Sequence, residues 1–125
     1  KLVEDGPLVV DFWATWCEPC KSIMEFHNQY HREYSKEGFK VLMINMERKG
    51  FLEKVKTYLE HNDFQFYVAT DQNNALFNRF SQKQMPTVIL VAKGGEVKWI
   101  RNGYIAGDEA EMKNQIDILL ENNIE

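Results

Sequence analysis

Two cysteines, Cys17 and Cys20, are the residues of this chain best suited to chemistry, and they are its only cysteines. They lie three positions apart in the stretch DFWATWCEPCK, directly after an apolar run. A pair at this spacing closes too small a loop to stabilise the chain much through entropy, and a disulfide scaffold would use several bridges. The spacing instead favours thiol–disulfide exchange, in which one thiolate attacks and the other resolves.

A metal site is the alternative, because Cys17, Cys20, His27 and His31 follow one another at spacings that superficially resemble a zinc clip. The pattern after the cysteines predicts one helix over about residues 19–36, and a helix rises about 1.5 Å per residue. Cys20 and His27 would then lie about 10 Å apart along its axis, too far for one ion with ligand bonds of about 2 Å. We therefore expect no metal, and expect both histidines to be ordinary helix-surface or partly packed residues.

Apolar patterning predicts the elements that position the pair. The run LVVDFW, residues 8–13, is typical of a buried strand, and Ile23, Phe26, Tyr30 and Tyr34 then recur at helical spacing. Helices between the early strands imply parallel crossovers, and a late Gly-Gly turn implies an antiparallel hairpin. The expected class is α/β, a mixed central sheet with helices on both faces. In chain order, we expect strands at 8–13, 39–46, 64–69, 87–93 and 96–104, and helices at about 19–36, 51–62, 73–80 and 108–120.

This layout places Cys17 at the N-terminus of the first helix and Cys20 one turn further in. Unpaired N–H groups and a partial positive charge at a helix N-terminus favour a thiolate, and Pro19 in the first turn costs no hydrogen bond. Glu18 should oppose the thiolate, which disfavours a strongly oxidising couple, and Lys21 partly offsets it. We expect Cys17 to be exposed and to attack, and Cys20 to be shielded and to resolve.

The length, composition and net charge of the chain limit the possible functions further. A chain of 125 residues is most simply one domain, residues 1–125, and 44% hydrophobic with 27% charged residues is ordinary for a globular protein. A net charge of −4 gives no reason to expect nucleic acid or an anionic membrane as partner. The apolar runs are strand-sized, so we expect no membrane insertion. Because the chain starts at Lys1 without methionine, we interpret it as excised from a longer chain.

The stretch VVDFWATWCEPCK resembles the active-site segment of the thioredoxin superfamily, and MPT before an apolar strand matches its second signature. Gly103, in RNGY, falls where the family has a glycine after the hairpin. The resemblance covers nearly the whole chain and implies a thioredoxin-like fold. The 40 positions from Met46 to Pro86 hold an inserted helix–strand unit that plain thioredoxins lack. This insertion is similar to the TlpA/ResA-like branch, whose members are typically membrane-tethered or periplasmic reductants.

The resemblance also implies roles for residues outside the cysteine pair. It implies a cis peptide bond between Met85 and Pro86 that faces the cysteines and exposes the Met85 backbone to an extended substrate segment. Gly103 would border the same substrate site. Trp16, beside the nucleophile, would form a wall of the substrate groove.

Asp11 occupies the buried-acid position of thioredoxins. Desolvation there raises the pKa of the carboxyl group, so that it can take the proton from Cys20 during resolution. A lysine on the neighbouring strand usually accompanies this acid, but alignment places Met43 there, so we expect Asp11 to be unpaired. The chain also departs from the family at Glu25, where a helix proline is expected, and at Ile23, where the ResA-like branch often has glutamate.

The expected function is thiol–disulfide oxidoreductase, most simply a reductant of protein disulfides that is itself re-reduced by a separate thiol donor. No cofactor is required, and a monomer is expected. The resemblance alone implies a periplasmic or other extracytoplasmic location. Two alternatives stay open: a thiol oxidase of the same fold, and a redox-inactive module that binds peptides.

Overall fold

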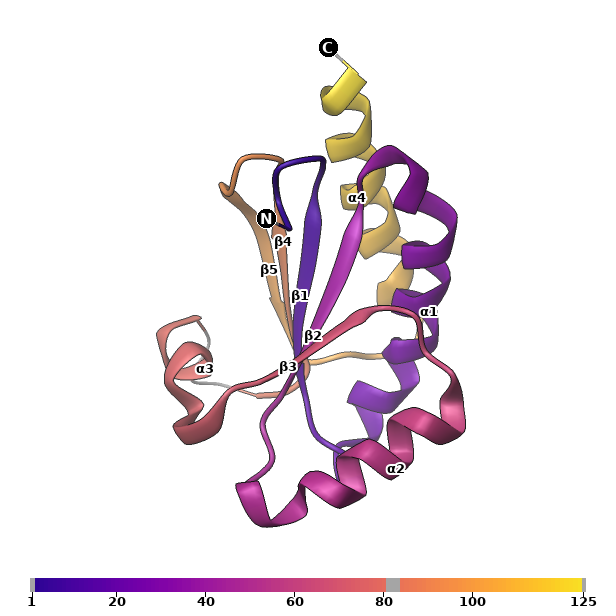
Figure 1. Ribbon diagram of the computed structural model, residues 1–125. Coiled ribbons are helices and arrows are strands. Elements are labelled where there is room, and N and C mark those ends of the chain that lie inside the picture. Colours follow the sequence, from indigo (N-terminus) through magenta and orange to yellow (C-terminus); the bar gives the residue numbers. More distant parts are fainter. Residues whose placement is uncertain (1, 81–83, 125) are drawn as a thin grey trace.

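The computed structural model describes residues 2–80 and 84–124, and its centre is a five-stranded sheet with strand order β3-β2-β1-β4-β5 (Figure 1). The central strand pairs in parallel with β2 and antiparallel with β4. β3 extends the parallel side, and β5 extends the antiparallel side. The strands are β1 (Leu8–Trp13), β2 (Lys40–Asn45), β3 (Tyr67–Thr70), β4 (Thr87–Val91) and β5 (Val97–Asn102). The predicted mixed sheet with an interior first strand is confirmed.

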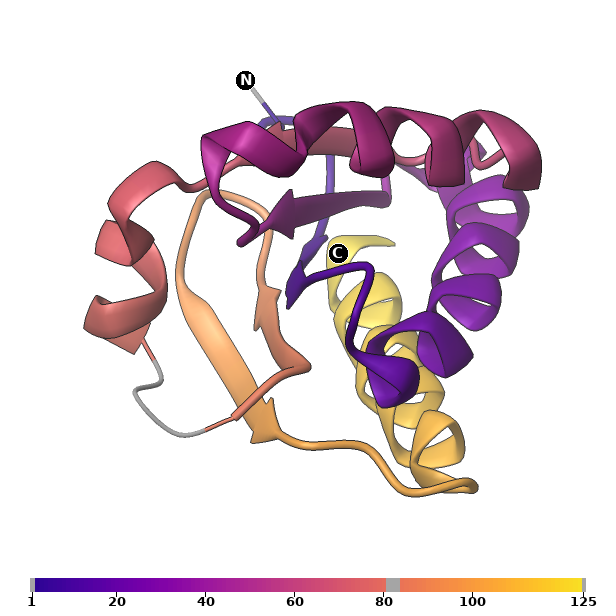
Figure 2. The same cartoon turned by 90° about the horizontal axis from the view of Figure 1, so that it is seen from below.

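Helices cover both faces of the sheet, as predicted. In Figure 1, α1 and α4 lie together on one side of the sheet and α3 lies on the other, while α2 crosses below the ends of the strands. Figure 2, seen from below, shows α2 running along that edge. The helices are α1 (Glu18–Tyr34), α2 (Leu52–Asn62), α3 (Ala75–Phe80) and α4 (Asp108–Ile124). Within the described part of the chain, no helix combines the length and apolar character needed to cross a membrane.

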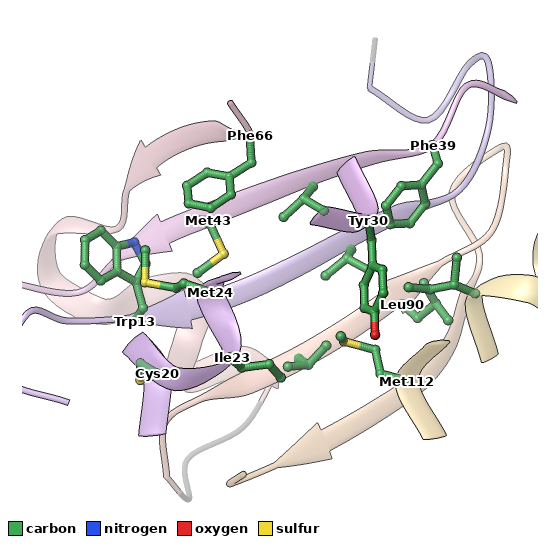
Figure 3. Packing of buried hydrophobic residues seen from close by; sticks show 14 of the residues in the cluster. Trp13, Cys20, Ile23, Met24, Tyr30, Phe39, Met43, Phe66, Leu90 and Met112 are labelled. Carbon is green, nitrogen blue, oxygen red and sulfur yellow. The ribbon is translucent and has the colours of Figure 1, made fainter. Parts of the chain in front are cut away.

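The main hydrophobic core lies between the sheet and the α1–α4 layer (Figure 3). Side chains alternate along a strand, so Val9 and Trp13 point into this core, while Leu8 and Phe12 point into a smaller cluster on the opposite face. Phe12 there meets Phe77 of α3 with ring centroids 5.6 Å apart. Fully burying each such side chain stabilises the fold by about 1.5–3 kcal/mol, so β1 is fixed from both sides.

The third predicted strand is displaced. Residues 64–69 were expected to pair, but β3 begins only at Tyr67, where it first lies opposite Leu42 of β2. Phe64 and Phe66 instead stack on each other, with centroids 4.7 Å apart, and Phe66 is buried in the main core. The apolar run therefore reflects core packing ahead of the strand as much as the strand itself.

Candidate active site

The strand ends bring five loops to one edge of the sheet. Trp13 at the end of β1 lies beside Asn45 at the end of the parallel strand β2, and Asn45 lies beside Thr70 of β3. On the antiparallel side, Phe12 lies opposite Thr87 at the start of β4, and Thr87 lies opposite Asn102 at the end of β5. The loops that follow β1, β2, β3 and β5 and the loop that precedes β4 therefore meet here, and the first of them carries the cysteines.

Cys17 and Cys20 form a disulfide, with their Cα atoms 5.3 Å apart. Cys17 is the N-cap of α1, and the backbone N–H of Cys20 donates to its Sγ at 3.3 Å. Sγ of Cys20 lies 3.9 Å from the carbonyl oxygen of Phe12, against the central strand. Cys20 is completely buried, and Cys17 keeps 6% of its surface. Cys17 is thus the more accessible cysteine, but the prediction that it is exposed is wrong, because its Sγ is bonded to Cys20 and accepts a hydrogen bond from the Cys20 N–H.

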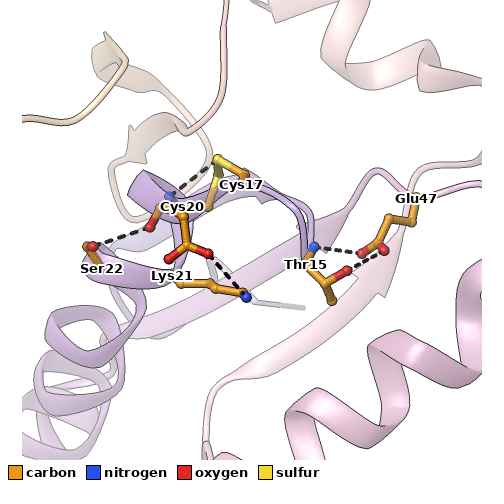
Figure 4. Close-up of polar contacts among 7 residues, drawn as sticks. Thr15, Cys17, Cys20, Lys21, Ser22 and Glu47 are labelled. Carbon is orange, nitrogen blue, oxygen red and sulfur yellow. Dashed lines mark hydrogen bonds and ion pairs between the residues drawn. A yellow bond between two sulfur atoms is a disulfide. The ribbon is translucent and has the colours of Figure 1, made fainter.

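The first turn of α1 also carries one acidic and one basic residue next to the cysteines (Figure 4). Glu18 is exposed and forms an ion pair with Lys21 at 3.5 Å. Lys21 also lies over the ring of Tyr58 in α2, with Nζ 5.1 Å from the centroid. Pro19 is in the first turn of α1, where its missing N–H costs nothing. This ion pair agrees with the expectation that Lys21 partly offsets the negative charge of Glu18 beside Cys17.

A buried carboxylate just after β2, that of Glu47, supports the cysteine loop and was not predicted from the sequence. Glu47 accepts hydrogen bonds from the Thr15 backbone N–H at 2.8 Å and from the Thr15 hydroxyl at 2.6 Å (Figure 4). The Asn45 side-chain amide donates to the same carboxylate at 3.0 Å. These bonds tie the loop just before Cys17 to the end of β2. No local signal marks this pairing, because Thr15 and Glu47 lie 32 positions apart.

Asp11 is completely buried, as predicted, but it is not unpaired. Its neighbours in the adjoining strands are Met43 and Val88, so the expected absence of a strand lysine is confirmed. The partner comes from α1 instead: His27 Nε2 lies 2.8 Å from Asp11 Oδ2. Burial raises the pKa of the Asp11 carboxyl group, while the hydrogen bond and charge of His27 oppose that rise. Asp11 shares its face of β1 with Trp13, which turns it toward α1.

The prediction that both histidines are surface or partly packed residues is wrong for His27, which has no exposed surface. The buried stripe of α1 contains Cys20, Ile23, Met24, His27 and Tyr30. Seven positions, or about two helical turns, separate Cys20 from His27. Helical periodicity therefore places both residues on one face of α1 and predicts that His27 is buried. Phe26, which the apolar pattern predicts in this stripe, is only partly buried and packs against the edge of the main core.

The loop before β4 and the end of β5 meet as predicted. The Met85-Pro86 peptide bond is cis. The backbone N–H of Gly103 donates to the carbonyl oxygen of Pro86 at 2.7 Å, which joins the two loops. Gly103 has φ +83°, a left-handed backbone conformation that glycine adopts without the strain a side chain would bring. Met85 is partly buried and packs against the core cluster that contains both cysteines.

Trp16 projects from the cysteine loop and is 65% exposed. It lines a groove of about 770 Å³ together with residues after β2 and β3. The groove lining is Trp16, Met46, Glu47, Arg48, Phe51, Lys54, Asn73 and Asn74. Trp16, directly before Cys17 and at the border of an open groove, is placed to touch whatever docks on that cysteine.

Among the residues that the structure describes, no group of three or more His, Cys, Asp or Glu side chains is arranged to hold a metal ion. His31, the other histidine of the zinc-like pattern, accepts a hydrogen bond from the backbone N–H of Val41 at its Nδ1, 3.1 Å away. This bond attaches α1 to the start of β2.

A CxxC disulfide at a helix N-terminus, at the end of the central strand and at the same sheet edge as a cis-proline loop, defines a thioredoxin-like protein. A family model described as Redoxin matches residues 1–116, and the chain belongs to the Redoxin family. The structure is also similar to a putative thiol:disulfide interchange protein DsbE from Chlorobium tepidum, with a TM-score of 0.86 and 27% identity over 94% of this chain and 82% of that one. A putative thioredoxin from Neisseria meningitidis has the same fold, with a TM-score of 0.84 at 23% identity over 97% of this chain and 79% of that one.

Curated relatives fall in the branch that the motifs indicated. The thiol-disulfide oxidoreductase ResA of Geobacillus kaustophilus is 32% identical over 103 residues, which are 82% of this chain and 58% of that protein. The protein of the same name from Oceanobacillus iheyensis is 27% identical over 109 residues, 87% of this chain and 56% of the relative. The chain thus spans little more than half the length of these relatives. The resemblance to TlpA/ResA-like proteins is confirmed.

Proposed function

We propose that this chain is a thiol–disulfide oxidoreductase that reduces disulfides in other proteins. The observation that carries the proposal is the Cys17–Cys20 disulfide, formed at the N-terminus of α1 with the exposed Trp16 beside it. A helix N-terminus stabilises the thiolate that exchange requires. The names of the ResA relatives and of the DsbE-like structure support the same activity.

The exchange conserves atoms and electrons in two steps. The Cys17 thiolate attacks one sulfur of the substrate disulfide; that bond breaks, a mixed disulfide forms, and one substrate thiolate leaves. The Cys20 thiolate then attacks Sγ of Cys17, which forms the disulfide seen in the structure and releases the second substrate thiolate. Two electrons pass to the substrate, whose two thiolates are protonated. A separate dithiol donor must then reduce Cys17–Cys20, and no other cofactor is needed.

Asp11 is our candidate for the group that accepts the proton of Cys20. Sγ of Cys20 lies against the Phe12 carbonyl oxygen, and the side chains on either side of Phe12, Asp11 and Trp13, point to the same face of β1 as α1. Burial raises the pKa of this carboxyl group, which makes its carboxylate a better proton acceptor. His27, two turns after Cys20 on α1, holds this carboxyl group in place.

The substrate edge in this proposal includes Met85, Pro86 and Gly103. These residues lie on the β4–β5 side of the cysteine loop and are joined to each other by the bond from Gly103 to Pro86. An extended substrate segment could pair with the Met85 backbone in the manner of strand addition. The substrates would be extracytoplasmic proteins, by analogy with the TlpA/ResA-like branch.

The proposal is tested by reduction of a protein disulfide, such as insulin, with dithiothreitol as donor. The parent should accelerate the reaction, and Cys17→Ser should remove the acceleration. A parent without activity would favour a redox-inactive binding module. The reduction potential separates the remaining alternative, because a value near about −270 mV indicates a reductant and one near about −120 mV an oxidant.

A further inference from the structure

The groove beside Trp16 lies on the opposite side of the cysteine loop from the proposed substrate edge. Its other walls come from the segments after β2 and β3, whereas Met85, Pro86 and Gly103 belong to the β4–β5 side. Because β1 is central in the strand order, Cys17 stands between the two. We call this the insertion groove and define it by Trp16, Arg48, Phe51, Lys54, Asn73 and Asn74. It is formed largely by the segment that distinguishes this chain from plain thioredoxins.

The insertion groove combines exposed aromatic surface with exposed positive charge. Trp16 is 65% exposed and Phe51 is 54% exposed, although large aromatic side chains are usually buried. Arg48 and Lys54 are also exposed, and the structure gives neither cation an ion pair among the residues it describes. Two solvated cations beside two aromatic surfaces fit a ligand that carries both negative charge and an apolar group.

The one acidic residue of the lining, Glu47, does not cancel this pattern at the surface. It is buried, and its two carboxylate oxygens accept hydrogen bonds from Thr15 and Asn45. The exposed charges of the groove are therefore both positive, on a chain whose net charge is −4. Two exposed cations on a chain of negative net charge favour a partner that is itself acidic at this place.

Two asparagines complete the far wall. Asn73 and Asn74 both have positive φ, 67° and 57°, a conformation that asparagine tolerates better than most residues. The turn is held by Asp71, whose carbonyl oxygen accepts from the Asn74 N–H at 3.1 Å and whose carboxylate accepts from two further N–H groups at the start of α3. The amide side chains can offer hydrogen bonds to an extended polypeptide that passes along the groove.

We propose that the insertion groove binds the substrate segment that flanks the reacting disulfide, and that it selects an acidic side chain next to an apolar one. The acidic group would lie between Arg48 and Lys54, and the apolar group against Trp16 and Phe51. Trp16 precedes Cys17 directly, so the groove begins one residue from the nucleophile and takes substrate residues within a few positions of the attacked cysteine. This inference rests on the proposed function and names its substrate class.

Three synthetic peptides test the selection. They share one intramolecular disulfide loop and carry Asp-Phe, Lys-Phe or Asp-Ser on both sides of it. The reduced protein is mixed with each peptide, and the second-order rate of oxidation is followed by the change in tryptophan fluorescence or by acid quenching. Bis(2-hydroxyethyl) disulfide, which is small and uncharged, measures the exchange chemistry alone. Every peptide rate is divided by this reference rate.

The parent should react at least about threefold faster with the Asp-Phe peptide than with the Lys-Phe peptide, since each exposed charge contact changes an equilibrium or rate by about 1.5- to fivefold. The preference should shrink as salt is added. In the variant Arg48→Glu/Lys54→Glu the preference should reverse. In Phe51→Ser the advantage of Asp-Phe over Asp-Ser should be lost.

The double variant Lys56→Glu/Lys93→Glu is the matched control. It changes the net charge by the same amount, Lys56 is an exposed residue of α2 outside the groove lining, and Lys93 lies in the hairpin beyond β4. This variant should keep the preference of the parent. If it loses the preference as fully as the groove variant does, net charge and not the groove determines selection.

The outcomes separate this inference from the proposed function. Equal reference-corrected rates for all three peptides would overturn the groove and leave the oxidoreductase activity standing. A preference that survives Arg48→Glu/Lys54→Glu would also overturn it. If the reduced protein reacts neither with the peptides nor with bis(2-hydroxyethyl) disulfide, the proposed function itself is wrong.

Discussion

His27 Nε2 lies 2.8 Å from Asp11 Oδ2, and neither side chain has any exposed surface. This buried acid is thus held by a residue of α1, the helix that contains Cys20, rather than by a neighbouring strand, where Met43 lies opposite Asp11. Any movement of α1 against β1 would change this contact. The other ring nitrogen, His27 Nδ1, has no hydrogen-bond partner among the described residues, so Asp11 is the main polar anchor of the imidazole.

Replacement of His27 by leucine should therefore destabilise the protein strongly at neutral pH. Removing one partner of a buried hydrogen-bonded pair leaves the other group desolvated and unsatisfied, which costs about 1–3 kcal/mol and more for a charged group. The cost should fall as the pH is lowered and the Asp11 carboxyl group takes up its proton. Urea unfolding of the disulfide form at pH 4 and pH 7 measures both values.

His27→Gln is the control for this variant, since it keeps a donor that can reach Asp11 and should cost less than leucine. The double variant Asp11→Asn/His27→Leu removes the carboxylate as well. Its destabilisation should be smaller than the sum of those of the two single variants. Additive effects would show that the two side chains do not interact energetically.

Asp11→Asn should flatten the pH dependence of stability. A pKa raised in the folded state means that the folded protein holds the proton more tightly, so the parent loses stability as the pH rises from about the ordinary value of 3.8 through the folded pKa. The asparagine variant has no such proton. Its stability relative to the parent should increase between pH 4 and pH 8, because only the parent loses stability over this range. A constant difference across this range would contradict a raised pKa.

The same substitution should slow resolution of the mixed disulfide. The first attack uses the Cys17 thiolate at the helix N-terminus and should keep its rate, whereas attack by Cys20 requires loss of its proton in a fully buried place. Loss of a general base typically costs about 10²-fold or more. Rapid quenching with acid, followed by mass spectrometry, should show a mixed disulfide that accumulates in Asp11→Asn but not in the parent at neutral pH. Equal lifetimes of the mixed disulfide would remove Asp11 from the mechanism.

The two cysteines should behave differently when each is replaced by serine. Cys17 keeps some exposed surface and caps the helix, while Cys20 has none. Cys17→Ser should abolish exchange, and Cys20→Ser should still attack but stall as a mixed disulfide, because nothing resolves it. Alkylation of the reduced parent provides an independent check, with Cys17 modified first. Faster modification of Cys20 would reverse the assignment.

The sequence predicted the centre of this fold better than its polar interior. β1 was placed correctly because LVVDFW is buried on both faces and is bounded by residues that do not continue the strand. The cysteine pair and the cis Met85-Pro86 bond could be predicted from the sequence because a local motif marks each. Where Phe64 and Phe66 were concerned, the apolar run could not distinguish a loop packed in the core from a paired strand.

Buried polar pairs could not be found in the same way, because each joins segments distant in sequence. His27 had a partial signal, its position two turns after Cys20, but the sequence contains nothing that names Asp11 as its partner. Glu47 had none, since a glutamate after a strand is usually solvated. Such contacts depend on the sheet register, which places the end of β2 beside the end of β1.

Glu47 yields the last prediction, because it holds the cysteine loop through Thr15. Glu47→Ala leaves the Thr15 N–H and the Asn45 amide without their acceptor, and hydrogen bonds to a charged group contribute about 1.5–3 kcal/mol each. Thr15→Val removes only the hydroxyl bond and should cost less. Urea unfolding should give this order, with Glu47→Ala destabilised by about 3 kcal/mol or more. The exchange rate with bis(2-hydroxyethyl) disulfide should also fall in Glu47→Ala, because the loop that positions Cys17 loses its attachment to β2. If Thr15→Val proved as damaging as Glu47→Ala, the contribution of the carboxylate would lie in the hydroxyl contact alone, and the backbone bond to the loop would carry little.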